Sequence, residues 1–320
     1  MRVNHRFLYW GIFFVAIGGI LVASDLRAVD TPTLTDVLRL WPLALVAIGL
    51  SIVLRRTRLS LPGLMLAAAV PGLVVGGALA VAPRFVGDCG ARGVPASVAG
   101  KQGTFDAAAT VTVRSGCGSL NVKTSPGNGW QFDAGNTAGR TPTIDASPQS
   151  LSIDANGDNG PDFLDAGRDA WNLTLPTSDL DSVSLVVNAG RGQVALPGAR
   201  INRLSLTANA AEILVDASAA SVANLSAVVN AGSLSIHLPA DSDVVGSLRV
   251  GAGQLQICSP PGLGLRIASR GTAEMVRVDG LQQHESEWQS PDYASATHRA
   301  DLSVNVNFGV VEINPIGGCK

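Results

Sequence analysis

The chain has 320 residues, of which only 15% are charged and 46% are hydrophobic. Average soluble domains carry about 25% charged residues. The composition therefore excludes an ordinary, wholly soluble protein, and the length predicts two domains. The formal net charge is −2 at pH 7, and no basic stripe with interleaved aromatic residues occurs, so we expect no nucleic-acid partner.

The first 82 residues contain three apolar runs that predict transmembrane helices. The runs cover residues 7–23, 38–54 and 61–82, and about 20 apolar residues cross a bilayer. Arginines precede the first run and separate the second from the third, so the positive-inside rule places the N-terminus in the cytoplasm. Three spans put the rest of the chain outside. We therefore expect a multi-pass cell-membrane protein with the lipid bilayer as a partner and an extracytoplasmic C-terminal domain.

Two other interpretations of this region stay open. One is a cleaved signal peptide over residues 1–24, although Leu21, Val22 and Ala23 make a poor cleavage site. The other is that Pro71 splits the third run into a re-entrant hairpin, which would leave the C-terminal domain inside the cell. Proline is, however, tolerated within transmembrane helices.

A linker is expected over residues 83–103, which contain glycine, alanine and proline, and a second domain over residues 104–320. Residues 173–278 of this domain repeat with a period of 21 residues. One apolar column consists of Leu173, Val194, Val215, Ile236, Ile257 and Val278, and a second of Ile213, Leu234, Leu255 and Val276. Prolines recur at Pro176, Pro197, Pro239 and Pro260, and asparagines at Asn188, Asn209 and Asn230.

A fixed period of this length is typical of a solenoid, whose coils bury their apolar faces against one another. Apolar and polar residues alternate in segments such as 233–238, which indicates strands. Asn and Gly tolerate positive φ, so residues 188–190 and 230–232 predict a tight corner. We therefore predict three transmembrane α-helices followed by an all-β domain, a parallel β-solenoid with 21-residue coils. A β-sandwich is the alternative, but it needs no fixed period.

The pattern continues outside the regular repeat. Residues 118–122 resemble residues 232–236, so irregular first coils are expected to begin near residue 104. Residues 281–299 break the period and predict a loop or hairpin on one coil, and residues 302–313 resume it as the final coil. The end coil presents an edge through which self-association is expected.

The chain resembles a known family over residues 7–58. Trp10-Gly11 followed by an apolar run to Ser24-Asp25-Leu26, and then Leu40-Trp41-Pro42-Leu43 with a run to Ile48-Gly49-Leu50, look like the membrane region of LiaF-type envelope-stress proteins. Residues 104–315 are similar to the adhesin-like β-solenoid domains of unknown function that follow such regions. The resemblance implies a bacterial multi-pass membrane protein, and a sensor histidine kinase as its partner.

All four cysteines follow the last predicted span, which fits an oxidising compartment. Four cysteines allow three pairings. We favour Cys89–Cys117 and Cys258–Cys319, because each disulfide would tie an end of the domain to the solenoid.

An acidic loop is the sharpest candidate for a metal site. Side-chain oxygens recur at positions 1, 3, 5, 9 and 12 of a 12-residue segment, as in a calcium loop; the residues are Asp154, Asn156, Asp158, Asp162 and Asp165. Position 6 is Asn159 rather than glycine, and position 12 is Asp rather than Glu, so a solvated turn is the alternative. Calcium is the only cofactor that the sequence raises.

No arrangement of residues indicates catalysis. The residues of segment 284–287 form a polar loop, His237 alternates outward between Ile236 and Leu238, and neither makes a triad. We therefore expect a non-enzymatic protein. Two functions fit: an envelope-stress or signalling accessory that contacts a membrane partner such as a sensor kinase, and a membrane-anchored adhesin-like or cell-wall-binding module.

Overall fold

The computed structural model describes residues 14–15, 94–155, 167–177, 180–270, 276–285 and 287–315. The chain divides into two compact units, residues Met1–Phe85 and Val86–Lys320. The three predicted spans lie outside the described residues, apart from two helical residues at 14–15. Among the described residues, no helix has the length and hydropathy of a membrane span. The second unit is called the β domain below.

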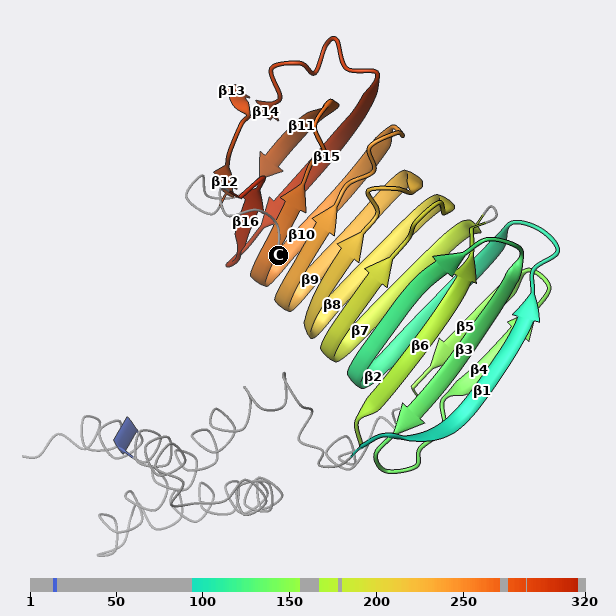
Figure 1. The fold of residues 1–320 in the computed structure, drawn as a ribbon. Coiled ribbons are helices and arrows are strands. Elements are labelled where there is room, and N and C mark those ends of the chain that lie inside the picture. Colours follow the sequence, from blue (N-terminus) through green and yellow to red (C-terminus); the bar gives the residue numbers. More distant parts are fainter. Residues whose placement is uncertain are drawn as a thin grey trace, which may run out of the picture. The chain divides into compact units, whose positions relative to one another are not determined.

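Sixteen strands join in one sheet in the described part of the β domain (Figure 1). They are β1 (Ala96–Thr104), β2 (Ala109–Ser125), β3 (Gly129–Asn136), β4 (Thr143–Ser147), β5 (Ser150–Asp154), β6 (Asp169–Pro176), β7 (Leu180–Ala195), β8 (Arg200–Asp216), β9 (Ser221–His237), β10 (Val244–Cys258), β11 (Leu263–Arg270), β12 (Val276–Val278), β13 (Gln282–His284), β14 (Glu287–Gln289), β15 (His298–Val306) and β16 (Val310–Ile313). The prediction of an all-β domain is confirmed.

Strands β7, β8, β9 and β10 lie side by side and pair in parallel, each with the next along the chain. Val194 pairs with Val215, Val215 with Ile236, and Ile236 with Ile257. The apolar column of the sequence is therefore a row of neighbours in space, one coil apart.

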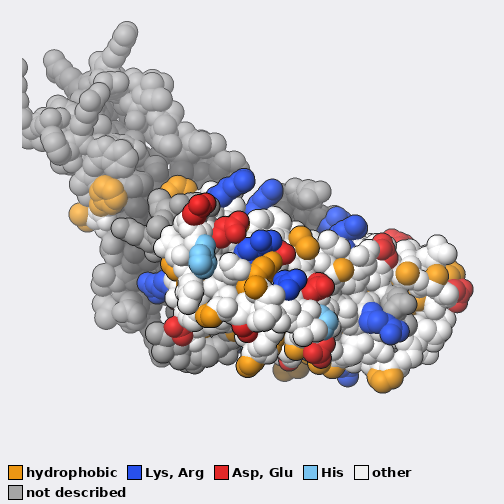
Figure 2. All heavy atoms as spheres, turned by 90° about the horizontal axis from the view of Figure 1, so that it is seen from above, with side chains coloured by type: hydrophobic (Ala, Val, Ile, Leu, Met, Phe, Trp, Pro, Cys, Tyr) orange, Lys and Arg blue, Asp and Glu red, His pale blue; other side chains and the backbone are white. Residues whose placement is uncertain are grey.

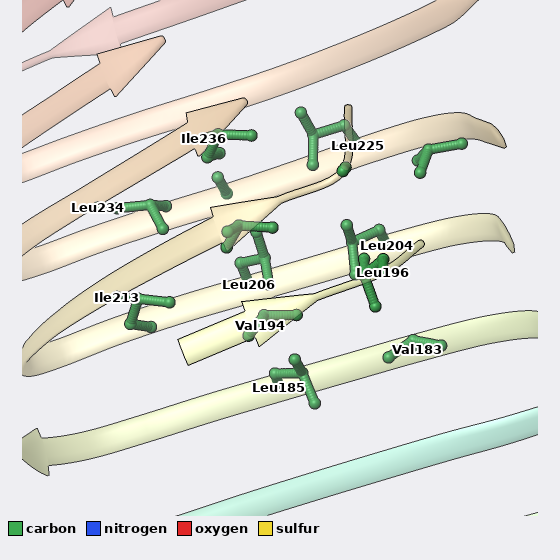
Figure 3. Close-up of a cluster of buried hydrophobic side chains, with 14 of the residues drawn as sticks. Val183, Leu185, Val194, Leu196, Leu204, Leu206, Ile213, Leu225, Leu234 and Ile236 are labelled. Carbon is green, nitrogen blue, oxygen red and sulfur yellow. The ribbon is translucent and has the colours of Figure 1, made fainter. Parts of the chain in front are cut away.

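Each of these long strands bends halfway along its length. In β7 a first run, residues 180–187, leads through a corner at residues 188–190 to a second run, residues 191–195. Alternate side chains of both runs point into a shared interior, where Val183, Leu185 and Val194 are at most 3% exposed (Figure 3). The core thus lies between the two runs. The outward side chains of the second runs form a surface that we call the second-run face.

The corners use glycine and asparagine for different purposes. Gly190 and Gly232 have φ of +105° and +116°, and a Cβ added to Gly190 would meet the backbone oxygen of Gly118 in the neighbouring coil. Asn188, Asn209 and Asn230 do not have positive φ, since Glu285 and Asn314 are the only described non-glycine residues that do.

The asparagines instead form a ladder across the coils. The Nδ2 atom of Asn209 donates to Asn188 Oδ1 over 2.7 Å, and the Nδ2 atom of Asn230 donates to Asn209 Oδ1 over 2.6 Å. Side-chain amides ladder in this way when identical residues stack at the spacing of strands.

At both ends, the order of the coils in space differs from their order in the sequence. Val122 of β2 pairs with Leu173 on one side and with Val194 on the other. At the opposite end, Ile313 pairs with Ile257 and with Val278. Leu173 and Val194, which are consecutive in the apolar column, are therefore not direct neighbours. Residues 302–313, expected as the final coil, lie between β10 on one side and β11 and β12 on the other. A 21-residue column identifies residues on one face, but it does not identify which coil lies next to which.

Antiparallel strands cover the two ends of the stack. At one end β3 pairs with β6, and β1 pairs with β3. At the other end β14 pairs with β11, and β13 with β14, which realises the hairpin expected within residues 281–299. Strand β1 begins at Ala96, inside the predicted linker 83–103, because its residues complete this N-terminal cover rather than joining two domains. The outer edges are thus short covering strands and not complete coils.

Candidate functional site

A polar hollow of about 410 Å³ lies on the second-run face. It is lined by Arg191, Gly192, Gln193, Glu212, Ile213, Leu214, Ser233, Leu234, Ser235, Gln254 and Gln256. The outward-facing residues that strand β9 contributes are serines, Ser233 and Ser235, since Leu234 faces the core. The flanking strands carry longer side chains at the corresponding positions. Leu214 and Gln256 are the direct neighbours of Ser235 on either side. The hollow therefore exists because two small residues lie between rows of large ones.

Ser235 is the innermost polar group of this hollow. It points outward by strand alternation, since Leu234 and Ile236 are core residues, yet it is only 7% exposed. Its hydroxyl has no hydrogen-bond partner within the described part of the chain. A buried hydroxyl without a partner costs about 1–3 kcal/mol, so a ligand that reached it would relieve this cost. The oxygen is screened from solvent, so a ligand reaches it only when a neighbouring side chain, Leu214 or Gln256, turns aside.

One wall of the hollow is held by a hydrogen-bond network. Gln254 and Gln256 donate from Nε2 to Oε2 of Glu312, over 2.9 and 3.0 Å. Arg277 Nη1 donates to the other carboxylate oxygen of Glu312 over 3.1 Å. The hydrogen bonds from Gln256, Gln254 and Arg277 hold the pKa of Glu312 below its ordinary value. Both glutamines are thus fixed from the side facing away from the hollow.

The opposite wall carries a pair of opposite charges. Arg191 Nε lies 3.4 Å from Glu212 Oε2, and both side chains are about two-thirds exposed. Exposed pairs of this kind add little stability, but they leave the hollow without net charge. Figure 2 shows one face of the molecule on which basic and acidic side chains are interspersed and hydrophobic side chains are scattered.

A second hollow of about 370 Å³ lies on the same face. It is lined by Asn121, Val122, Lys123, Gln131, Asp133, Asn172, Leu173, Thr174, Gln193 and Ala195. Gln193 lines both hollows, so the two are neighbours. We call the pair, from β3 to β10, the amide groove, because asparagine and glutamine side chains recur along it.

A second polar cluster serves the C-terminal cover. Asp301 Oδ1 accepts hydrogen bonds from Arg266 Nε over 2.8 Å and from the Tyr293 hydroxyl over 2.6 Å. Arg299 donates to the carbonyl of Tyr293 and lies over its ring. Burial raises the pKa of Tyr293. The cluster anchors the segment between β14 and β15 to the sheet.

The predicted calcium loop lies almost entirely outside the described residues. Only Asp154 is described, at the end of β5, where its carboxylate lies 3.6 Å from Arg114 Nη1. Asn156, Asp158, Asp162 and Asp165 lie outside the described residues. Elsewhere in the described ranges, no group of three His, Cys, Asp or Glu side chains could hold a metal. The calcium site stays a prediction.

Two of the four cysteines lie among the described residues and two lie outside them. Cys117 lies at the corner of β2 and Cys258 at the end of β10, and neither is a free thiol. Cys89 and Cys319, the other members of the two predicted pairs, lie outside the described residues. The pairing stays a prediction.

The membrane region matches a known family model over residues 9–89, the LiaF transmembrane domain. The N-terminal region is a LiaF transmembrane domain. This confirms the resemblance seen in the sequence, and a LiaF transmembrane domain implies location in a lipid bilayer.

The β domain is similar to solved structures. A candidate cell adhesion protein from Clostridium sporogenes aligns with 16% identity and a TM-score of 0.46, over 69% of this chain and 99% of that one. A candidate adhesin from Bacteroides fragilis aligns with 9% identity and a TM-score of 0.29, over 67% of this chain and 96% of that one. A comparison with curated proteins found no match.

The amide groove was not predicted from the sequence. The segment around Ser233 and Ser235 was interpreted only as an alternating strand. The available signal was the outward column itself, in which serine follows Leu214 and precedes Gln256 at 21-residue steps. Reading the outward columns by side-chain size, and not only the apolar ones, would have indicated the hollow.

Proposed function

We propose that this protein is a non-enzymatic, multi-pass membrane protein that displays its β domain, a β-solenoid, outside the cell. We further propose that the protein is an accessory of envelope-stress signalling that contacts a membrane partner such as a sensor kinase. The observation that carries this is the LiaF transmembrane domain at residues 9–89. In this proposal the β domain works by binding, and its cysteines pair as Cys89–Cys117 and Cys258–Cys319 in an oxidising compartment.

Photo-crosslinking in living cells tests the partner. Full-length protein would carry a photoreactive residue at position 41, in the second predicted span, or at Phe308, which is 85% exposed on the β domain. A histidine kinase crosslinked from position 41 and identified by mass spectrometry is the expected result. Adducts to cell-wall material from position 308, with no kinase adduct from position 41, would contradict the signalling role.

The second candidate function is a membrane-anchored adhesin-like or cell-wall-binding module. The amide groove favours it, because two adjoining hollows on one face, with a buried unpartnered hydroxyl, offer a surface for an extended ligand. Long stacks of coils present such surfaces without any catalytic group. The two crosslinking positions separate this function from the first.

A further inference from the structure

The amide groove presents a fixed set of hydrogen-bond acceptors. An ionised carboxylate accepts but cannot donate, so the Nε2 atoms of Gln254 and Gln256 must face Glu312. Glu312 belongs to β16, and β16 pairs with β10 on the side away from β9. Both glutamines also line the hollow, and because each nitrogen is turned to Glu312, the amide oxygen is the group that each can offer a ligand there. A ligand there meets two oriented acceptors.

The floor of the groove adds the Ser235 hydroxyl, which can donate and accept. It is more than nine-tenths buried and unpartnered among the described residues. A ligand hydroxyl in the hollow would give it a partner and would also donate to the glutamine oxygens. The polar groups of the hollow are thus matched to a ligand rich in hydroxyl groups.

Charge and backbone pairing argue against two other classes of ligand, polyanions and peptides that bind as an added strand. Arg191 and Glu212 neutralise each other, so the first hollow lacks the excess of cations that a polyanion needs. An extended peptide binds by adding a strand to a free sheet edge. The second run of β9 is already paired with β8 and β10, so no backbone groups are free for a peptide strand.

The second hollow indicates the length of the ligand. It adjoins the first at Gln193 and adds further amides, including Asn121, whose Nδ2 donates to Asn172 Oδ1 over 3.2 Å. A volume of 410 Å³ lies at the small end of ligand sites, which span about 300–1,000 Å³. A chain that runs from one hollow into the next would use both.

We propose that the amide groove binds a neutral oligosaccharide chain, with Ser235 and the oriented oxygens of Gln254 and Gln256 receiving its hydroxyl groups. This deepens the proposed function, since it rests on the β domain acting by binding. It does not depend on the kinase partner.

Titration calorimetry of the full-length protein in detergent micelles tests the proposal. The probes are cellotetraose and tetra-N-acetylchitotetraose, which are neutral, and tetragalacturonate, which is anionic and of equal length. We expect a neutral probe to bind more tightly than the anionic one. Ser235→Leu fills the hollow and should weaken binding about tenfold or more. Ser226→Leu lies in the same strand on the first run, away from the groove, and should leave the affinity unchanged.

A second variant guards against misfolding. Ser235→Ala removes only the hydroxyl, so it should weaken binding several-fold while the thermal midpoint stays at or above that of the wild type. Binding of neither neutral probe by folded protein, tighter binding of tetragalacturonate, or equal losses in Ser235→Leu and Ser226→Leu would each overturn the proposal. None of these results would alter the crosslinking result, so the two proposals fail separately.

Discussion

The corner glycine Gly190 offers a sharp test of how the coils stack. Its φ is +105° and an added Cβ would meet the Gly118 backbone. A side chain in such a conformation costs about 1–3 kcal/mol, and forcing an atom against well-packed neighbours costs about another 1–3 kcal/mol. Replacing glycine reduces the freedom of the unfolded chain, which returns about 0.4–1 kcal/mol. We therefore expect Gly190→Ala to destabilise the β domain by about 1–6 kcal/mol.

Gly127→Ala is the matched control. Gly127 has a similar φ, +113°, but a Cβ there would meet nothing within 4 Å. Gly127→Ala should cost only the backbone strain. The free energies of unfolding of the two variants should therefore differ by the cost of the steric contact, about 1–3 kcal/mol. Thermal unfolding of the full chain, followed by the fluorescence of buried Trp130 and Trp171, measures this difference. Equal midpoints for the two variants would refute the close approach of neighbouring corners.

Three further predictions follow from the coils and the groove. Asn209→Ala removes both hydrogen bonds of the central ladder residue. At about 0.5–1.5 kcal/mol for each bond, it should lower the free energy of unfolding in urea by about 1–3 kcal/mol. No loss of stability relative to Thr207→Ala would contradict the role of the ladder. Leu206→Ala, in the core, should cost about 2–5 kcal/mol in the same assay, and a cost below that of Asn209→Ala would contradict the placement of the core. The pKa of Glu312 is lowered in the folded protein, so the stability that its charge contributes is present above the unfolded pKa and is lost as the pH falls through the folded pKa. Glu312→Gln should therefore lower the thermal midpoint at pH 7 and flatten the dependence of that midpoint on acid pH. An unchanged pH profile would contradict the hydrogen-bond network around Glu312.

The sequence predicted the regular part of the β domain well. The column of Val194, Val215, Ile236 and Ile257 became four neighbouring residues, because each coil repeats the same apolar and polar alternation. The corners were also located correctly, although the asparagines serve there as a ladder and not as positive-φ residues.

The order of the end coils could not be predicted in this way. Val122 lies between Leu173 and Val194 because the chain passes over one coil and returns, and periodicity does not record such a crossing. The amide groove depends on the same feature: Gln254 and Glu312 are 58 residues apart and meet only because β16 inserts next to β10.

The proposed display of the β domain outside the cell is tested most directly by a reporter cysteine. Phe308→Cys lies at an 85% exposed position, and Thr57→Cys lies in the loop predicted to be cytoplasmic. Intact cells would be treated with a membrane-impermeant maleimide without prior reduction, and the wild type would give the baseline. We expect Phe308→Cys to be labelled in intact cells and Thr57→Cys to be labelled only after lysis. Labelling of Phe308→Cys only after lysis would place the β domain in the cytoplasm and contradict the three-span arrangement.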